Sequence, residues 1–189
     1  MKKNLLTSVL MTVVTTVLLG LVYPLVVTGL AQILFPEKAN GQLVRRNGTV
    51  IGSHLIAQPF GGARYFHPRP SAAGVNGYDA SNSAGSQLGP TNQKLIDRVN
   101  ADVASAQAEN PGKPVPIDLV TTSASGFDPH ITPAAAEFQV PRVAKARGMS
   151  EEAVRALVAG NTRGRQWGFL GEPRVNVLDM NLALDALSK

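Results

Sequence analysis

The sequence predicts an α+β protein with one N-terminal transmembrane helix followed by a single mixed α/β domain that lies outside the cytoplasm. Three observations predict this arrangement. Residues 4–36 contain no charged side chain, an Asn-Gly pair at residues 47–48 separates two short runs that suit strands, and helix caps followed by helically spaced apolar residues recur towards the C-terminus. We therefore divide the chain into a tail with a span, residues 1–36, and one domain, residues 37–189.

The apolar segment is long enough to cross a bilayer. At about 1.5 Å per residue, residues 9–35 make a helix of about 40 Å, whereas the hydrocarbon core of a bilayer measures about 30 Å. A cleaved signal peptide is the alternative, because Lys2 and Lys3 resemble its basic start and residues 29–31 (Gly-Leu-Ala) resemble its cleavage site. Signal peptides have apolar runs of about 7–15 residues, so the length favours a retained anchor.

Basic residues flank the span on both sides. Lys2 and Lys3 precede it, and Lys38, Arg45 and Arg46 follow it, so charge counting leaves the orientation open. A long domain crosses the membrane largely regardless of its charge. We therefore expect the N-terminus in the cytoplasm and the domain outside it.

The composition excludes several classes of protein. The formal net charge is +5, and setting aside Lys2 and Lys3 leaves 16 of the 18 basic residues against 13 acidic ones. The sequence contains no dense Lys/Arg tract with interleaved aromatic residues, so we expect no nucleic-acid partner. Because the chain has no cysteine, the domain has to rely on its apolar core rather than on disulfides, and a domain of this size can form one.

Small and polar side chains recur every fourth residue along the span, at Ser8, Thr12, Thr16, Gly20, Pro24, Thr28 and Gln32. Small residues let another helix approach closely, and hydroxyls can bond across such a contact, so the row predicts packing against partner helices. The plainer alternative is that Thr and Gly are simply common in spans. Pro24 has no N–H to donate to the carbonyl of Gly20, so these two residues also predict a kink.

A β-hairpin is predicted near the start of the domain. Two short runs, residues 43–46 and 49–51, flank Asn47 and Gly48. An Asn-Gly pair tolerates the positive φ angles of a type I′ turn, which is the tight connection that joins antiparallel strands.

Residues 59–90 form a long segment rich in Gly, Ser, Asn and Pro, a composition typical of a linker. Three aromatic residues within it, Tyr65, Phe66 and Tyr78, indicate instead an ordered loop. Arg69, fixed between two prolines, follows the first two rings. This part of the loop therefore either plugs the core or presents a rigid surface to a protein partner.

The next segment is predicted to contain a helix and an extended run. Apolar residues follow helical spacing over residues 91–108, and the Asn-Pro-Gly at residues 110–112 stops the helix. Residues 115–122 then have the composition of an extended run.

The C-terminal elements follow from their caps. Thr132 before a proline and Ser150 before two glutamates each predict the start of a helix, and Gly160 predicts the end of the second one. Residues 174–178 suggest a short buried strand, and Asp179 is expected to cap a last helix.

Ser123, Ser125, Asp128 and His130 lie within eight consecutive residues. A serine nucleophile with His130 as base and Asp128 as its orienting group is one interpretation. The ring of the intervening proline and the absence of a Gly-x-Ser-x-Gly motif favour a structural turn instead. A third interpretation is a polar surface facing a partner or a cation, whose candidate residues are Tyr65, Arg69, Asp79, Ser123, Ser125, Asp128, His130 and Glu137.

Metal and phosphate sites receive little support. The three histidines, His54, His67 and His130, have no short ligand spacing and no cysteine beside them, so we expect no metal site. The tract at residues 83–90 could present backbone amides to a phosphate but lacks the Gly-Lys-Ser/Thr ending of a P-loop. Its weak candidates are Ser83, Gly85, Ser86 and Gly89.

Several short motifs occur along the chain in a specific order. They are Tyr23-Pro24, residues 65–71, 83–90, 123–126 and 131–133, Gln139, residues 142–144, 175–177 and 181–185. In this combination, over nearly the whole chain, they resemble the KdpC family, the C subunit of the Kdp high-affinity potassium-transporting ATPase. Ala84, Gln87 and Phe127 depart from the pattern, where Gly, Asn and Leu are expected, which weakens a backbone-amide role for residues 83–90.

The resemblance implies an accessory subunit of a bacterial inner-membrane complex that imports potassium. Its implied partners are a channel-like potassium-binding subunit, a P-type ATPase subunit that hydrolyses ATP, a small single-span subunit and membrane lipid. The family's C subunit is described as a catalytic chaperone that raises the ATP affinity of the hydrolysing subunit. The resemblance therefore implies no catalysis and no firmly bound cofactor here, ATP and potassium being ligands of the complex.

The predicted topology constrains this role. A periplasmic domain cannot touch cytoplasmic ATP, so any effect on ATP affinity has to be transmitted as coupling between sites. The residues favour a polar cap over the outer mouth of the channel, with the span packed among neighbouring helices. The alternative function is a signal-anchored periplasmic serine hydrolase using Ser125 and His130, which would act without partners.

Overall fold

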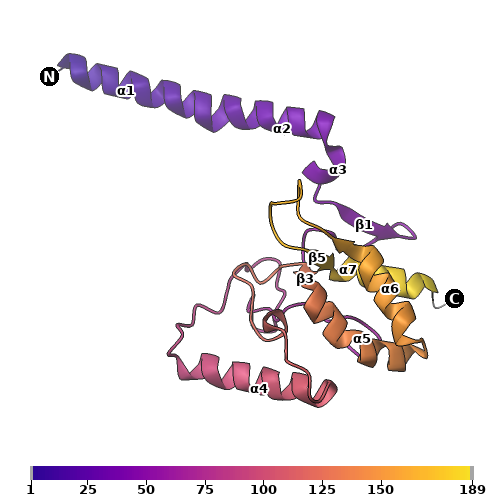
Figure 1. Ribbon diagram of the computed structural model, residues 1–189. Coiled ribbons are helices and arrows are strands. Elements are labelled where there is room, and N and C mark those ends of the chain that lie inside the picture. Colours follow the sequence, from indigo (N-terminus) through magenta and orange to yellow (C-terminus); the bar gives the residue numbers. More distant parts are fainter. Residues whose placement is uncertain (1, 188–189) are drawn as a thin grey trace. The chain divides into compact units, whose positions relative to one another are not determined.

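The computed structural model describes residues 2–187 (Figure 1). The chain forms two compact units, which meet in sequence between residues 43 and 44. The first contains a long apolar helix and the second combines helices with short strands, so the predicted α+β class with an N-terminal apolar helix is confirmed. The boundary predicted from the sequence, after residue 36, lies seven residues before the boundary between the two compact units, after residue 43.

The first unit is dominated by one continuous helical rod. It consists of α1 (Lys2–Val17), a π-helical turn η1 (Leu18–Val22) and α2 (Tyr23–Leu34). None of these residues is buried within the chain. At about 1.5 Å per residue the rod measures about 50 Å, which is long enough, and its composition apolar enough, to cross a membrane.

A π turn lies at the position where Gly20 and Pro24 predict a kink. The N–H of Tyr23 donates to the carbonyl of Leu18, five residues earlier. Pro24 has no N–H and its ring would crowd the carbonyl of Gly20 in a regular α-helix, so a wider turn relieves the conflict.

The hairpin follows a short helix, α3 (Pro36–Ala39). Its strands are β1 (Leu43–Arg46) and β2 (Thr49–Ser53). Asn47 has a φ of 52° and Gly48 a φ of 80°. The predicted hairpin is confirmed, because both turn residues have the positive φ that a type I′ turn requires.

The helix predicted over residues 91–108 is confirmed as α4 (Gln93–Glu109). The side chain of Asn92 caps it by accepting a hydrogen bond of 3.0 Å from the N–H of Lys94. No helix or strand lies between β2 and α4, a stretch that is fully described.

The extended run predicted over residues 115–122 is wrong at its centre. A 3₁₀ turn, η2 (Ile117–Leu119), replaces it because Asp118 is turned into the protein. Its carboxylate accepts hydrogen bonds from the N–H and the hydroxyl of Thr132, at 2.7 and 3.2 Å.

A three-stranded antiparallel sheet organises the second unit. Its strands are β3 (His130–Ile131), β4 (Thr162–Arg163) and β5 (Arg174–Asn176), with β5 in the middle. Val175 lies opposite Ile131 on one side and Thr162 on the other. The central strand therefore joins the two halves of the C-terminal region.

Three helices surround this sheet: α5 (Pro133–Arg147), α6 (Glu151–Asn161) and α7 (Val177–Leu187) (Figure 1). The caps predicted at Thr132 and Ser150 are confirmed. Each hydroxyl accepts a hydrogen bond from the backbone N–H three residues on, at 3.1 and 3.2 Å. α6 ends one residue beyond the predicted Gly160.

The predicted cap at Asp179 is wrong, and the strand before it is shorter than expected. The side-chain oxygen of Asn176 accepts a hydrogen bond of 3.2 Å from the N–H of Asp179, so α7 begins at Val177. Asn176 is buried and its amide also donates to the carbonyl of His54, at 2.9 Å. Asp179 is thereby left to pair with the ring of His54, at 2.6 Å.

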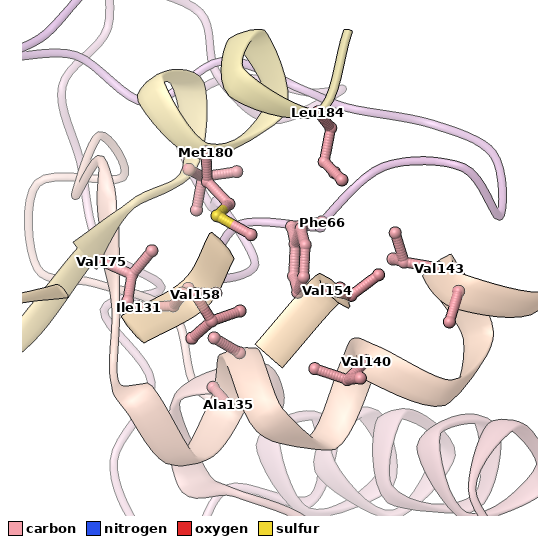
Figure 2. Packing of buried hydrophobic residues seen from close by; sticks show 13 residues of the cluster. Phe66, Ile131, Ala135, Val140, Val143, Val154, Val158, Val175, Met180 and Leu184 are labelled. Atoms are coloured by element: carbon pink, nitrogen blue, oxygen red, sulfur yellow. The ribbon is translucent and has the colours of Figure 1, made fainter. Parts of the chain in front are cut away.

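The apolar core lies between these helices and the sheet. Figure 2 shows the ring of Phe66, which comes from the long loop, amid side chains of α5, α6 and α7. The cluster consists of Phe66, Ile131, Ala135, Ala136, Val140, Val143, Ala144, Val154, Val158, Val175, Val177, Met180 and Leu184. Phe66 is the only aromatic ring in it, and the loop that carries it is therefore part of the core.

Candidate functional site

The long loop, residues 59–90 and called the aromatic loop below, is fixed to the core by two buried amide side chains. The N–H and carbonyl of Phe66 bond to the side chain of Asn181, at 2.8 and 3.0 Å. The N–H and carbonyl of His67 bond in the same way to Gln139, at 2.7 and 3.2 Å. Since an amide offers both a donor and an acceptor, each one replaces a rung of a β-ladder for one residue of irregular backbone.

Arg142 of α5 binds the same loop from another direction. Its Nη1 donates to the carbonyls of Gly62, Ala63 and Tyr65, at 3.3, 3.0 and 3.0 Å. Its Nε lies 2.9 Å from the carboxylate of Glu109 at the end of α4. Burial lowers the pKa of Arg142, and Glu109 opposes that shift.

Tyr65 is held by the end of α5 and by α7. The guanidinium of Arg147 lies over its ring, 5.0 Å from the centroid, and the phenol donates to Asp185 at 3.3 Å. Arg147 also donates to the carbonyl of Arg64 at 2.7 Å and pairs with Asp185 at 2.9 Å. These contacts favour the interpretation in which the first two rings of the aromatic loop pack against the domain itself.

Arg69, Asp128 and His130 come together as one cluster. Nη1 of Arg69 lies 3.0 Å from Asp128, and its Nη2 reaches the hydroxyl of Thr121 and the carbonyl of Thr122, at 3.5 and 3.4 Å. Asp128 also accepts a hydrogen bond of 3.0 Å from the N–H of His130. Burial raises the pKa of Asp128, but hydrogen bonds from His130 and Arg69 outweigh it and the pKa is lowered, so the carboxylate stays ionised.

The serines of this segment have structural hydrogen bonds instead of catalytic ones. The hydroxyl of Ser125 accepts from the N–H of Phe127 at 3.1 Å, and Ser123 is buried. Gly126 has a φ of 75°, and a Cβ there would lie 2.6 Å from the Cβ of Ala73. Within residues 2–187 no hydrogen bond joins either serine to His130, so the geometry supports the turn and gives the hydrolase alternative no support.

The candidate phosphate tract packs against this turn. Ser83 donates to the carbonyl of Ser125 at 3.0 Å. A Cβ on Gly85 would lie 3.1 Å from the carbonyl oxygen of Ala124, so the two chain segments pack closely there and a side chain would have to displace one of them slightly. Ser86 and Gly89 lie further along the same tract, and nothing in its contacts points to a phosphate.

The remaining polar candidates lie apart from the Arg69 cluster. Asp79 accepts hydrogen bonds from the hydroxyl and N–H of Ser81, which lower its pKa. Glu137 pairs with Arg155 at 2.7 Å on the rim of a surface cavity of about 580 Å³. The eight candidates thus form several separate groups, and three of them, Arg69, Asp128 and His130, line one shared depression.

The row of small and polar residues along the span, from Ser8 to Gln32, contains no residue that is buried by any other part of the described chain. The hydroxyls of Ser8 and Thr12 donate to carbonyls of their own helix, at 2.9 and 2.8 Å, so they need no external acceptor. A Cβ at Gly20 would meet only the methyl group of Thr16, at 4.0 Å. In a regular α-helix, residues four positions apart are rotated by about 40° relative to one another around the helix axis. The wider π turn rotates less per residue and therefore keeps the row closer to one face of the helix.

Sequence reasoning did not single out the residues that fix the aromatic loop. Gln139, Arg142, Asn181 and Asp185 occur in the motifs that carry the family resemblance, yet none was assigned a role. A signal was present, because a buried amide on an apolar helix face has to find a hydrogen-bond partner.

Comparisons with known proteins identify the family to which the chain belongs. The model of the family described as KdpC, K+-transporting ATPase, c chain, matches residues 5–186. A relative from Koribacter versatilis, called potassium-transporting ATPase KdpC subunit, is 71% identical over 98% of this chain and 95% of its own. Relatives with the same name from Acidobacterium capsulatum and Rhodopseudomonas palustris are 59% and 55% identical, over 97% and 98% of this chain and 98% and 99% of their own. The matches include both the apolar helix and the domain, and the chain therefore belongs to the KdpC family.

Proposed function

We propose that this chain is a non-catalytic accessory subunit of an ATP-driven potassium-import complex in a bacterial inner membrane. The observation that carries the proposal is the family match over residues 5–186, which includes the span as well as the domain. The relatives are named as subunits of a potassium-transporting ATPase, and they are matched over nearly their whole length. ATP hydrolysis and potassium binding belong, in this proposal, to partner subunits.

The span serves to assemble the complex. Its partners are the channel-like potassium-binding subunit, the P-type ATPase subunit and the small single-span subunit, together with surrounding lipid. Gly20, at the π turn, allows the closest approach of another helix because no side chain stands in the way.

Assembly is tested by co-purification of the complex through a tag on this chain. Gly20→Leu is expected to strip the chain of its partner subunits, because the new side chain fills the point of closest approach. Gly29→Leu is the matched control, since it makes the same chemical change on the same helix, off the four-residue row, where a Cβ meets nothing within 4 Å. Equal recovery of partners with both variants would refute the role of the row.

The domain acts from the periplasm as a rigid cap over the outer mouth of the channel-like subunit. The hydrogen bonds that fix the aromatic loop make the domain suited to this role, because a rigid surface loses little entropy on docking. Asp79 is exposed and its pKa is lowered, so it offers a fixed negative charge at the surface of the aromatic loop. The effect on ATP affinity then passes through the span as coupling between distant sites.

The side of the membrane is tested with a single cysteine. The chain has none of its own, and Ser105 is exposed on α4, so Ser105→Cys provides one reactive thiol. Labelling of intact cells by a membrane-impermeant reagent is expected. Labelling only after the cytoplasmic face is opened would place the domain in the cytoplasm and would refute the proposed cap over the outer mouth of the channel-like subunit.

A further inference from the structure

The connection between β4 and β5, which the proposed function does not use, is a hairpin with an exposed aromatic tip (Figure 1, between α6 and β5). Gln166 and Leu170 exchange backbone hydrogen bonds of 2.8 and 2.9 Å. Trp167 has a φ of 53° and Gly168 a φ of 84°, as in a type I′ turn. The side chains of Trp167 and Phe169 are nevertheless 84% and 67% exposed. An ordered turn thus displays two large rings to solvent.

Basic side chains stand behind this tip. Residues 162–174 contain three arginines and one glutamate. Arg165 pairs with Glu172 at 2.6 Å, whereas Arg163 contacts Asp179 only at 3.4 Å and keeps 64% of its side chain exposed. The hairpin therefore has aromatic side chains at its tip and arginines near the strands that carry it.

We propose that the hairpin of residues 164–171 is a membrane-interface anchor that places Trp167 and Phe169 among the lipid headgroups of the bilayer. Tryptophan prefers this layer because its ring is apolar and its N–H is polar, and arginine pairs with lipid phosphates. The proposal rests on the span crossing a bilayer, and it holds for either orientation and with or without the pump.

The length of the connecting chain keeps the domain close to that bilayer. α2 ends at Leu34 and β1 begins at Leu43. A fully extended chain covers about 3.3–3.6 Å per residue, so the first strand begins within about 30 Å of the end of the rod. A domain tethered this closely meets the headgroup layer continually, and a small interfacial contact is enough to orient it.

The shape of the tip favours lipid over a protein partner. A stable protein interface buries about 800 Å² on each side, whereas an aromatic residue buries about 150–250 Å². Trp167 and Phe169, with ring centroids 6.5 Å apart, form a small convex tip that falls short of such an area. A headgroup layer is soft and accepts a convex insertion of this size.

The chain contains one tryptophan, so its own fluorescence reports on Trp167 alone. The full chain is reconstituted in vesicles of phosphatidylcholine and phosphatidylglycerol, with or without bromine on the acyl chains of the phosphatidylcholine. We expect brominated lipid to remove most of the Trp167 emission and aqueous iodide to have little effect. Because the measurement uses this chain without partners, it is independent of whether the proposed pump assembles.

A matched control moves the tryptophan to another exposed loop. Val75 is 102% exposed, so the double variant Trp167→Phe, Val75→Trp carries its only tryptophan away from the hairpin. Its emission is expected to resist brominated lipid and to be quenched by iodide. If Trp167 behaves like this control in vesicles, the proposal is overturned, and a blue shift of Trp167 that needs added partner subunits would assign the hairpin to a protein contact instead.

Discussion

The aromatic loop has no regular secondary structure, yet it places Phe66 in the core, whereas α4 is a regular helix of 17 residues with no buried side chain. The loop is joined to α5 and α7 by bonds to both backbone groups of Phe66 and His67. The backbone groups of α4 are hydrogen-bonded within the helix, so α4 depends less than the loop on bonds to other elements.

α4 contacts its surroundings through half-buried apolar residues such as Leu95 and through polar groups that are partly exposed. Asn110, just after the helix, donates to the carbonyl of Phe138 at 2.9 Å, and Arg98 reaches the carbonyl of Val120 at 3.4 Å. Such partly exposed contacts contribute less to the free energy of unfolding than the full burial of a large side chain such as Phe66. Buried polar groups with hydrogen-bond partners, together with a buried ring, therefore integrate a segment into the core whether or not it has regular secondary structure.

The largest effect is expected from Phe66→Ala. Removing a fully buried ring leaves a cavity between the three C-terminal helices, and such changes cost about 3–5 kcal/mol of unfolding free energy. The matched change on α4 is Ile96→Ala, where 39% of the side chain is exposed, and we expect less than about 1 kcal/mol there. Urea unfolding of the full chain in detergent, followed by circular dichroism, measures both. Equal losses of unfolding free energy in the two variants would contradict the view that the aromatic loop belongs to the core and α4 does not.

Asn181→Ala is expected to have the next largest effect. It leaves the N–H and carbonyl of Phe66 buried without partners, and one such orphaned group costs about 1–3 kcal/mol. Asn92→Ala, which removes the cap of α4, is expected to cost about 1 kcal/mol. The same unfolding experiment ranks the two, and a larger loss at Asn92 would contradict the role assigned to the buried amide.

Glu109 links the two regions, and its removal tests how much that link matters. The carboxylate lies 2.9 Å from Arg142, but 39% of its side chain is exposed. Glu109→Gln is therefore expected to lower stability by about 0.5–1 kcal/mol at low salt and by less at high salt. Asp102→Asn, which breaks an ion pair of 3.2 Å within α4, is the control and is expected to have a smaller effect. A salt-independent loss at Glu109 would point to packing rather than charge.

The same contrast explains which elements the sequence predicted. The hairpin turn at Asn47 and Gly48 and the caps at Thr132 and Ser150 depend on residues at most a few positions apart, and all are confirmed. The apolar length of the span is equally local. Local rules therefore predicted elements but gave no indication of which ones form the core.

The rest depends on partners that are distant in sequence. The Phe66–Asn181 bond joins residues 115 positions apart, and the His67–Gln139 bond joins residues 72 positions apart. The predictions at Asp118 and Asp179 were wrong for the same reason, because partners distant in sequence decide which way each side chain turns. The candidate polar surface likewise divides into groups, since no pattern in one sequence specifies which of these loops meet.

The smallest expected effect is a pH dependence that originates where the aromatic loop is fixed. Burial, and then the charge of Arg142, lowers the pKa of His67 from the ordinary value of 6.5. The unfolded chain then binds a proton more readily than the folded one. The contribution of His67 to the unfolding free energy is therefore fully present above pH 6.5 and is lost as the pH falls from 6.5 towards the folded-state pKa.

Comparing the wild type with His67→Gln isolates this contribution. Asp128 also has a lowered pKa, so its contribution is lost only below about pH 4, and the two windows separate. The unfolding free energy of the wild type minus that of His67→Gln is expected to decrease by a few tenths of a kcal/mol between pH 7 and 5.5, because His67 is partly exposed. A difference that stays constant or increases on acidification would show that partial burial beside Arg142 does not disfavour the charged form of His67.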